Sequence, residues 1–548
     1  MTTLDLAVTG GGLTVTGAGS IPGIAETLDA LAAEDVPARL LTKDPTLWGP
    51  EAESEASIRL GWIEAPAISR ALVAPLAELH TELHDEGLDH IVLAGMGGSS
   101  LAPEVIARTL GKDLTVLDTT DPHQVRAALA DEGTLRRTVV VVSSKSGGTV
   151  ETDSHRRAFH QAFLDLGLSA EEAGRRFVVV TDPGSPLEST ARELGARAVF
   201  LADPNVGGRY SALTAFGLVP AALLGVNVTE LLDEAEATRS SLIEENNPAL
   251  VLGAAIGSAA TAGRDKLVIA EDGTGILGLG DWAEQLIAES TGKQGKGVLP
   301  VVVENPTAHG TTGDDVLLVT AGGSLHPGAV PGAGSKPDLT VNGSLGAQFM
   351  AWEYATAITG KILGIDPFDQ PNVAESKENT AKILASGPAR TTPAFTEGSV
   401  EVYGDAGLLG GAATVADAVG ALLSAIGGRG YLAVMAYLDR FGDSAAATLR
   451  PALATRTPHP VTFGWAPRFL HSTGQYHKGG PQNGAFLQIT GAVTEDLPVP
   501  GKPYTFGVLQ AAQAAGDLEA LAGRGRPVLR LHLTSRPTGL EQLLEALR

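Results

Sequence analysis

Apolar segments rich in β-branched residues alternate with segments of helical period over residues 66–225. The apolar segments lie at 90–94, 114–117, 138–142, 177–181 and 198–201. Strands that alternate with helices pair in parallel, and a strand without polar residues is typical of one buried on both faces. We therefore predict that 66–225 forms a three-layer α/β/α unit with a parallel sheet.

The same alternation continues less regularly after residue 225. Strands are expected at 266–270, 299–303, 316–320, 431–437, 461–463, 486–490 and 528–533. Two stretches rich in Gly and Pro, 321–337 and 386–412, are typical of surface loops or insertions. A chain of 548 residues is also too long for one core.

These patterns predict an α/β chain in three parts. Residues 1–65 form a small N-terminal extension with a hairpin near 4–15 and a helix at 24–33, and carry no evident chemistry. Residues 66–225 form the first α/β unit. Residues 226–548 form the second unit, with insertions and a C-terminal segment.

The segment 138–152, TVVVVSSKSGGTVET, joins a predicted strand to a helix through a loop of hydroxyl residues and glycines. Backbone N–H groups and a helix N-terminus at such a loop favour anion binding. The hydroxyls of Ser144, Ser146 and Thr149 and the ammonium of Lys145 suit a compact phosphate. The spacing of a nucleotide-binding P-loop is absent, which favours a sugar phosphate. The alternative is an ordinary strand-to-helix turn, where Ser and Gly are also common.

A second glycine-rich loop, GMGGSS at 95–100, follows the predicted strand 90–94. Because the carboxyl ends of parallel strands meet at one edge of a sheet, the two loops are expected to converge. Gly98 and Ser99 then join the phosphate site. A glycine-rich turn of this kind alone also serves close packing of a helix on a sheet.

The charge of the chain restricts its partners. A formal net charge of −24 argues against non-specific binding of nucleic acids or anionic membranes. A phosphate site therefore needs local Lys and Arg, which prevail because more distant carboxylates are screened beyond ~8 Å at physiological salt.

The absence of certain residues and segments indicates a compartment. The chain has no Cys, hence no disulfide and no Cys-ligated metal. Neither a signal-peptide pattern at the start nor a stretch of about 20 apolar residues is present. We expect a cytoplasmic protein.

Five short stretches together resemble the glucose-6-phosphate isomerase family and lie in the family's order. They are GMGGSS at 95–100, SSKSGGTVET at 143–152, GGRYSALTAFGL at 207–218, AESTGK at 288–293 and GIDPFDQPNVAESK at 364–377. The resemblance is closest to the isomerase half of transaldolase/glucose-6-phosphate isomerase fusions. It implies two α/β subdomains of the sugar-isomerase (SIS) type, usually in a homodimer. It also implies reversible interconversion of glucose 6-phosphate and fructose 6-phosphate through a cis-enediolate, without a metal or another cofactor.

The resemblance assigns catalytic roles to residues of these stretches. Glu289 matches the base, Arg209 the cation over the enediolate, Lys377 a group that assists ring opening, and Gln370 a substrate-binding residue. A carboxylate at a helix end beside a glycine turn can be partly desolvated, which raises its pKa. A planar, permanent cation also suits a delocalised anion. The alternatives are a solvated Glu, an Arg that binds backbone carbonyls and a surface Lys.

The family pattern also bears on the phosphate loops. Ser144, Ser146 and Thr149 would hold the phosphate, with Ser99 contributing from the first loop. Lys145 is the less firmly assigned member, because a side chain in such a loop can point away from the ligand. Glycines at 147–148 replace a bulkier, Thr-containing stretch of many family members, which removes one hydroxyl.

The ring-opening histidine departs from the family's order. The family places this residue before the FDQ stretch, where the chain offers only His309 and His326 in poor context. A better local match is HSTGQYHKGGP at 471–481, after that stretch. We predict His477 as the acid and base of ring opening, with His471 as the second choice, because a histidine titrates near neutral pH. The alternative is a loop histidine bonded to backbone.

Two other functions are considered. A phosphosugar isomerase of broader specificity would also accept mannose 6-phosphate. A non-catalytic sugar-phosphate sensor on the same fold would keep the phosphate loops but could lose the base. The joint presence of Glu289, Arg209 and Lys377 favours an enzyme.

Overall fold

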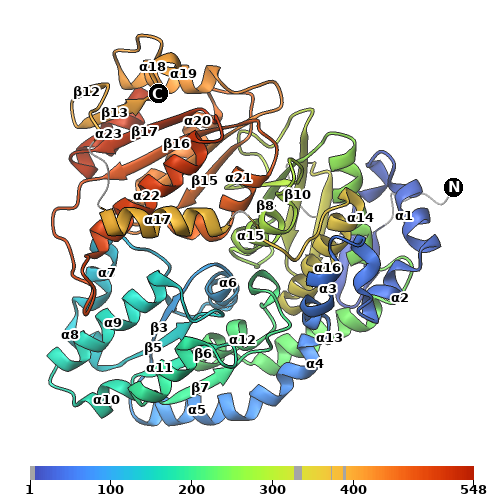
Figure 1. Cartoon of the computed structure of the whole chain (residues 1–548). Coiled ribbons are helices and arrows are strands. Elements are labelled where there is room, and N and C mark those ends of the chain that lie inside the picture. The colour runs from blue at the N-terminus through green and yellow to red at the C-terminus, as the bar shows by residue number, and fades with distance from the viewer. Residues whose placement is uncertain (1–6, 326–335, 372, 387–390) are drawn as a thin grey trace.

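Three β-sheets organise the protein, seen here in a computed structural model (Figure 1). The structure describes residues 7–325, 336–371, 373–386 and 391–548, with the backbone alone at 373–377 and 386. The sheets have the strand orders β4-β3-β5-β6-β7, β1-β2-β11-β10-β8-β9 and β12-β13-β17-β16-β14-β15. Helices separate most consecutive strands, so the expected α/β class is confirmed.

The first sheet is wholly parallel. Its strands are β3 (His90–Gly95), β4 (Thr115–Leu117), β5 (Thr138–Ser143), β6 (Phe177–Thr181) and β7 (Ala198–Leu201), close to the predicted bounds. Every residue of β5 is buried, because the strand is central and helices cover both faces. The strand order reverses between β3 and β5, which is where parallel sheets bind ligands.

The second sheet is mixed, because an N-terminal hairpin joins it. Four of its strands run in parallel: β8 (Lys266–Glu271), β9 (Leu299–Val302), β10 (Val316–Gly322) and β11 (Leu339–Gly343). The hairpin of β1 (Val8–Gly10) and β2 (Leu13–Thr16) extends the sheet through antiparallel pairing of β2 with β11. The expected loop at 321–337 begins inside β10, and its part at 326–335 lies outside the described residues.

The third sheet has a parallel centre and an antiparallel edge. Its strands are β12 (Phe395–Glu397), β13 (Val400–Gly404), β14 (Tyr431–Tyr437), β15 (Val461–Trp465), β16 (Gly484–Gly491) and β17 (Val528–Leu533). The stretch 386–412 was expected to be a surface loop or an insertion. In its described part from 391 onward it is not a loop alone, since β12 and β13 form a hairpin at the sheet edge. Its strands are short and alternate polar with apolar residues around a Gly turn, which imitates a loop in the sequence.

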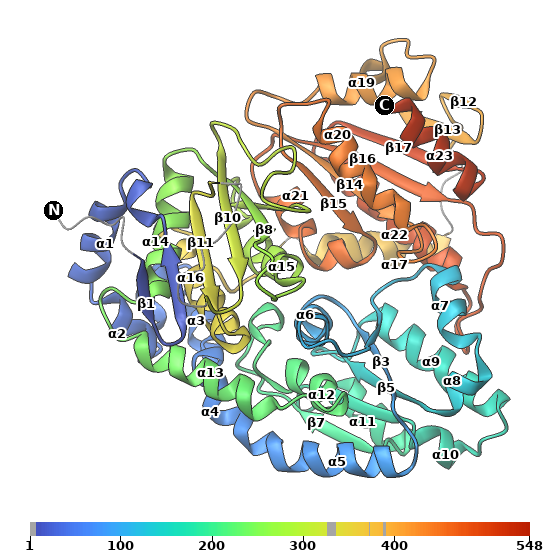
Figure 2. The ribbon, with the colours of Figure 1, turned by 180° about the vertical axis from the view of Figure 1, so that it is seen from behind.

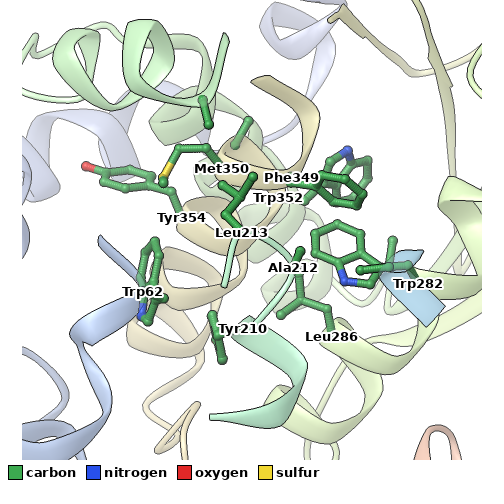
Figure 3. Close-up of a cluster of buried hydrophobic side chains, with 14 of the residues drawn as sticks. Trp62, Tyr210, Ala212, Leu213, Trp282, Leu286, Phe349, Met350, Trp352 and Tyr354 are labelled. Carbon is green, nitrogen blue, oxygen red and sulfur yellow. The ribbon is translucent and has the colours of Figure 1, made fainter. Parts of the chain in front are cut away.

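A large hydrophobic cluster surrounds α16 (Leu345–Leu363), as Figure 3 shows. Trp62 stacks on Tyr210 with ring centroids 5.4 Å apart, and Trp282 meets Phe349 edge-on at 4.8 Å. Leu286 of α15 (Leu279–Thr291) belongs to the same cluster. This packing fixes α15 and the segment around Tyr210 relative to each other.

The three sheets face one another around a few central helices (Figures 1 and 2). Helix α15 packs against α6 (Leu101–Thr109) and α21 (Gly474–Gly479), which come from the first and third sheet units. Within the described ranges, no helix combines the length and apolar character needed to cross a membrane.

Candidate functional site

The phosphate loop brings two of the predicted hydroxyls together. Oγ of Ser144 lies 2.9 Å from Oγ1 of Thr149, and Ser144 is buried. Thr149 is the N-cap residue of α9 (Val150–Asp165), but its hydroxyl contacts Ser144 instead of capping the helix. The N-cap side chain therefore does not bind the first N–H groups of α9, and a helix N-terminus of this kind favours an anion. Ser99, at the end of the first glycine loop, is also buried.

The other two predicted members of the loop point elsewhere. Ser146 is exposed, and its hydroxyl accepts a hydrogen bond of 3.3 Å from the N–H of Gly148. Nζ of Lys145 forms an ion pair of 2.5 Å with Asp182 Oδ2 after β6. The Lys145 side chain is therefore held at the end of the neighbouring strand.

The first glycine loop lies against three other segments of the site. A Cβ on Gly98 would lie 1.9 Å from the carbonyl oxygen of Gly208, so only glycine permits this approach. A Cβ on Gly97 would lie 2.6 Å from Nε2 of Gln285 and 2.9 Å from the carbonyl oxygen of His471. The loop thus lies where the Arg209 segment, α15 and the His471 segment converge.

Glu289 lies in the last turn of α15 and is 4% exposed, which excludes a solvated helix-end carboxylate. Its Oε2 is 3.5 Å from both Nη1 of Arg209 and Nε2 of Gln285. Burial raises the pKa of Glu289 above the usual range, and Arg209 and His471 partly oppose this effect. The arrangement yields a desolvated carboxylate with weak, long contacts, which can act as a base.

Arg209 is buried in a short 3-10 helix, η6 (Gly208–Tyr210). Its Nε donates to Ser290 Oγ at 2.8 Å. Its Nη2 donates to the carbonyl oxygens of Pro367 at 2.6 Å and Asp369 at 3.0 Å. These bonds fix the guanidinium plane and leave Nη1 directed toward Glu289.

Lys293 binds the same turn as Arg209. Its Nζ donates to the carbonyl oxygens of Asp366 and Asp369, each at 2.7 Å, and pairs with the Asp369 carboxylate. Burial lowers the pKa of Lys293 to about 8, and Arg209 acts in the same direction. Two cations therefore hold the turn that ends in Gln370, whose side chain is exposed.

Lys377 lies on α17 (Val373–Ser386), and its side chain is outside the described residues. Helix α17 packs along α22 (Phe506–Ala522) of the third sheet unit. In the sequence, α17 begins soon after the turn that Arg209 and Lys293 bind.

His471 joins the first and third sheet units. It ends η8 (Arg468–His471), and its Nε2 lies 3.2 Å from Oε1 of Glu151. Glu151 is buried in the first turn of α9, directly after the phosphate loop. The same oxygen of Glu151 accepts a hydrogen bond of 2.7 Å from Nε2 of Gln513 on α22.

His477 lies in an apolar environment on α21. Its Nδ1 is 2.9 Å from the hydroxyl of Tyr431, its ring stacks on Tyr431, and Phe486 meets it edge-on. Burial lowers the pKa of His477 well below its usual value. Within the described part of the chain, no hydrogen bond or ring contact links His477 to another predicted site residue. The structure thus brings His471, and not His477, to Glu151 beside the phosphate loop.

A cavity of about 240 Å³ connects the phosphate loop with the Glu151–His471 pair. Its lining comes from the start of α9, from η8, and from α17 and α22. The lining residues are Gly148, Thr149, Val150, Glu151, Thr380, Ala381, Leu384, Leu470, His471 and Gln513.

Sequence reasoning did not assign four polar residues of this region. Glu151 and Lys293 lie inside stretches that carry the family resemblance, so their position was a usable signal. Gln285 precedes Glu289 by one helical turn on the same face. Gln513 lies on α22, which the sequence patterns did not predict.

Comparison with known families and sequences gives consistent matches. The family model of phosphoglucose isomerase matches residues 83–314. A glucose-6-phosphate isomerase of Rubrobacter xylanophilus is 31% identical over 387 residues, which cover 58% of this chain and 88% of that protein. Glucose-6-phosphate isomerase 1, chloroplastic, of Arabidopsis thaliana is 31% identical over 351 residues, covering 54% of this chain and 57% of that protein. For a glucose-6-phosphate isomerase of Citrifermentans bemidjiense, the identity is 32% over 349 residues, and the coverage is 54% and 65%. The chain thus spans less than two thirds of the last two relatives.

Solved structures share the fold. A glucose-6-phosphate isomerase from Chlamydia trachomatis superposes with a TM-score of 0.56 at 20% identity, covering 69% of this chain and 90% of that one. A hypothetical protein from Thermus thermophilus gives a TM-score of 0.53 at 24% identity, covering 66% and 98%. The expected SIS-type α/β fold is confirmed at this level.

Proposed function

The chain belongs to the phosphoglucose isomerase family, and from this premise we propose that it interconverts glucose 6-phosphate and fructose 6-phosphate. The observation that carries the proposal is the buried Glu289 carboxylate, 3.5 Å from the guanidinium of Arg209. A base of raised pKa beside a permanent cation is what proton transfer through an enediolate requires.

The phosphate binds at the start of α9. The hydroxyls of Ser144 and Thr149 and the N–H groups of the first helical turn are its donors, and the family pattern adds the buried Ser99 from the first glycine loop. The exposed Ser146 would have to turn from its bond with the Gly148 N–H to contribute. Binding the phosphate away from the reacting carbons orients the sugar over Glu289.

Ring opening is assigned to His471 in place of His477. The support is its 3.2 Å contact with the buried Glu151 beside the phosphate loop. In this step the C1–O5 bond of the glucose ring breaks, the ring oxygen gains a proton, and the anomeric hydroxyl loses one. His471 delivers a proton to the ring oxygen and accepts the proton of the anomeric hydroxyl, so that it ends the step in its starting protonation state, and Lys377 assists from α17.

Isomerisation follows in the open chain. Glu289 takes the proton from C2 of the aldose and returns it to C1, while the hydroxyl proton moves from O2 to O1. Arg209 stabilises the negative charge of the intermediate enediolate. The raised pKa of Glu289 brings its basicity closer to that needed for removing a proton near neutral pH.

The resemblance of the sequence extends this proposal. A homodimer and kinship with the isomerase half of transaldolase fusions are expected from it. Mannose 6-phosphate would be accepted if the enediolate can rotate about its C2–C3 bond, so that C2 is protonated on the other face. Turnover of mannose 6-phosphate is therefore the assay for this broader specificity.

The substitution Glu289→Gln tests the proposed function. It keeps the size of the side chain and removes the base, so turnover of fructose 6-phosphate should fall by about 10²- to 10⁴-fold while sugar-phosphate binding remains. A matched control is Glu234→Gln, which neutralises another carboxylate of raised pKa, one that accepts the Gly346 N–H at the start of α16. Equal turnover in wild type and Glu289→Gln would contradict the assignment.

A further inference from the structure

Gln513 connects the third sheet unit to the Glu151–His471 pair. Its side chain is 3% exposed and lies on α22. Nε2 donates to Oε1 of Glu151 at 2.7 Å, and Oε1 of the amide accepts from the hydroxyl of Thr120 at 2.7 Å. The amide therefore joins residues of three segments that are distant in sequence.

The chemistry of these partners fixes the orientation of the Gln513 amide. An ionised carboxylate only accepts hydrogen bonds, so the NH₂ end of the amide must face Glu151. The amide oxygen then faces Thr120, whose hydroxyl can donate to it. Gln513 is thus held at both ends and cannot turn without breaking two buried hydrogen bonds.

Gln513 and His471 both contact the same carboxylate oxygen of Glu151, Oε1. The distances to Oε1 are 2.7 Å from Nε2 of Gln513 and 3.2 Å from Nε2 of His471. The Gln513 bond is short and charge-assisted, so it fixes the carboxylate plane to which the more distant imidazole is directed. If the amide is lost, the Glu151 carboxylate loses the hydrogen bond that orients it toward His471.

We propose that Gln513 is a positioning residue for ring opening, which acts through Glu151 on the His471 imidazole. This inference rests on the proposed function. It separates two parts of the reaction, because Gln513 contacts the ring-opening pair, whereas proton transfer between C1 and C2 depends on Glu289 and Arg209. A defect at Gln513 should therefore affect cyclic substrates alone.

The test compares two ketose substrates in wild type and Gln513→Leu. Fructose 6-phosphate must open its ring, whereas 5-deoxyfructose 6-phosphate has no O5 and is always an open chain. With fructose 6-phosphate, kcat/KM should fall roughly tenfold to a hundredfold, the effect of losing a hydrogen bond to a charged group. With the 5-deoxy substrate it should stay within about twofold of wild type, since no ring-opening bond is then needed.

Gln510→Leu is the matched control. Gln510 is also buried on α22, and its amide donates to Asp121 Oδ2 at 3.1 Å instead of to Glu151. Its loss should leave the ratio of the two kcat/KM values unchanged. Equal losses on both substrates in Gln513→Leu, or no loss on either, would overturn the inference. Failure of wild type to turn over either ketose would instead refute the proposed isomerase function.

Gln513→Glu supplies a second readout, the pH dependence of activity relative to wild type, which a purely structural role would not change. The introduced carboxylate faces Glu151 without a proton to donate, so ring opening should be impaired at neutral pH. As the pH falls and the new carboxyl becomes protonated, it can again donate to Glu151. Its activity on fructose 6-phosphate relative to wild type should rise toward acid pH. A pH-independent ratio would count against the positioning role.

Discussion

At the scale of residues, burial distinguishes side chains whose local sequences look equally suited to the site. Glu289, Arg209, Ser144 and Thr149 were predicted from short stretches that resemble the family. The structure places Glu289 beside Arg209 and Ser144 beside Thr149. The choice between two histidines in one glycine-rich stretch could not be made in this way. It depends on how α21 docks on the third sheet, which directs His477 into the core and leaves His471 beside Glu151.

The pH dependence of catalysis should reflect the burial of Glu289. Burial favours the protonated carboxyl and raises its pKa above 4.5, whereas the base must be ionised to act. Activity should therefore be lost as pH falls through a value above 4.5. The acidic limb of kcat/KM for 5-deoxyfructose 6-phosphate reports this group without ring opening, and a limb at or below 4.5 would contradict the assignment.

The two histidines should respond differently to substitution. His471→Asn should lower turnover of fructose 6-phosphate by about 10²-fold or more, because an amide cannot replace the acid and base. His477→Phe should leave kcat within a few-fold but cost about 1–3 kcal/mol of unfolding free energy, since the Tyr431 hydroxyl loses its partner in the core. The reverse pattern would restore His477 as the ring-opening residue.

At the scale of elements, buried ion pairs anchor η8, the 3-10 helix that carries His471. Nε of Arg468 lies 2.5 Å from Asp118 Oδ2 after β4, and its guanidinium also pairs with Glu104 of α6. Glu104 further pairs with Arg440, which follows β14. Burial alone would raise the pKa of Glu104, but Arg468 and Arg440 prevail and lower it to about 2.

Removal of Arg468 should therefore destabilise the protein strongly. Arg468→Met leaves Asp118 and Glu104 buried with fewer counter-charges, which should cost about 3–5 kcal/mol in chemical denaturation. In wild type, the contribution of Glu104 is present above its unfolded-state pKa near 4.5 and is lost as pH falls toward 2.

The exposed pair of Arg126 with Glu495 provides the control, because Arg126→Met should have little effect. An equally small loss in Arg468→Met would show that η8 does not depend on these ion pairs.

The helices and strands of the fold differ in how well they can be predicted from the sequence. The strands of the first sheet were predictable because buried central strands are apolar throughout. Helix α22 was missed because Ala and Gly dominate it and much of its surface is buried, which removes the amphipathic period. Gln513 therefore could not be placed in the site from the sequence.

At the scale of the whole molecule, one chain supplies the proposed site residues from all three sheet units. Glu151 follows a strand of the first sheet, Glu289 follows one of the second, and His471 follows one of the third. The family resemblance predicts a homodimer, but the Glu151–His471 contact is formed within one chain. The relation among the sheets could not be derived from strand patterns, because it depends on packing between helices such as α15 and α21.

This arrangement predicts that activity does not require association. Specific activity should stay constant when the protein is diluted through any dimer-to-monomer transition followed by sedimentation. Loss of activity in step with dissociation would mean that a second chain contributes to the site.

The measurement that tests the central claim most directly is steady-state turnover of fructose 6-phosphate by the purified wild-type protein, with EDTA present and glucose 6-phosphate detected as product. The account predicts rapid formation of glucose 6-phosphate, because Glu289 and Arg209 of the chain itself carry the proton transfer. Tight binding of the sugar phosphate without turnover would contradict the account and leave a sugar-phosphate sensor.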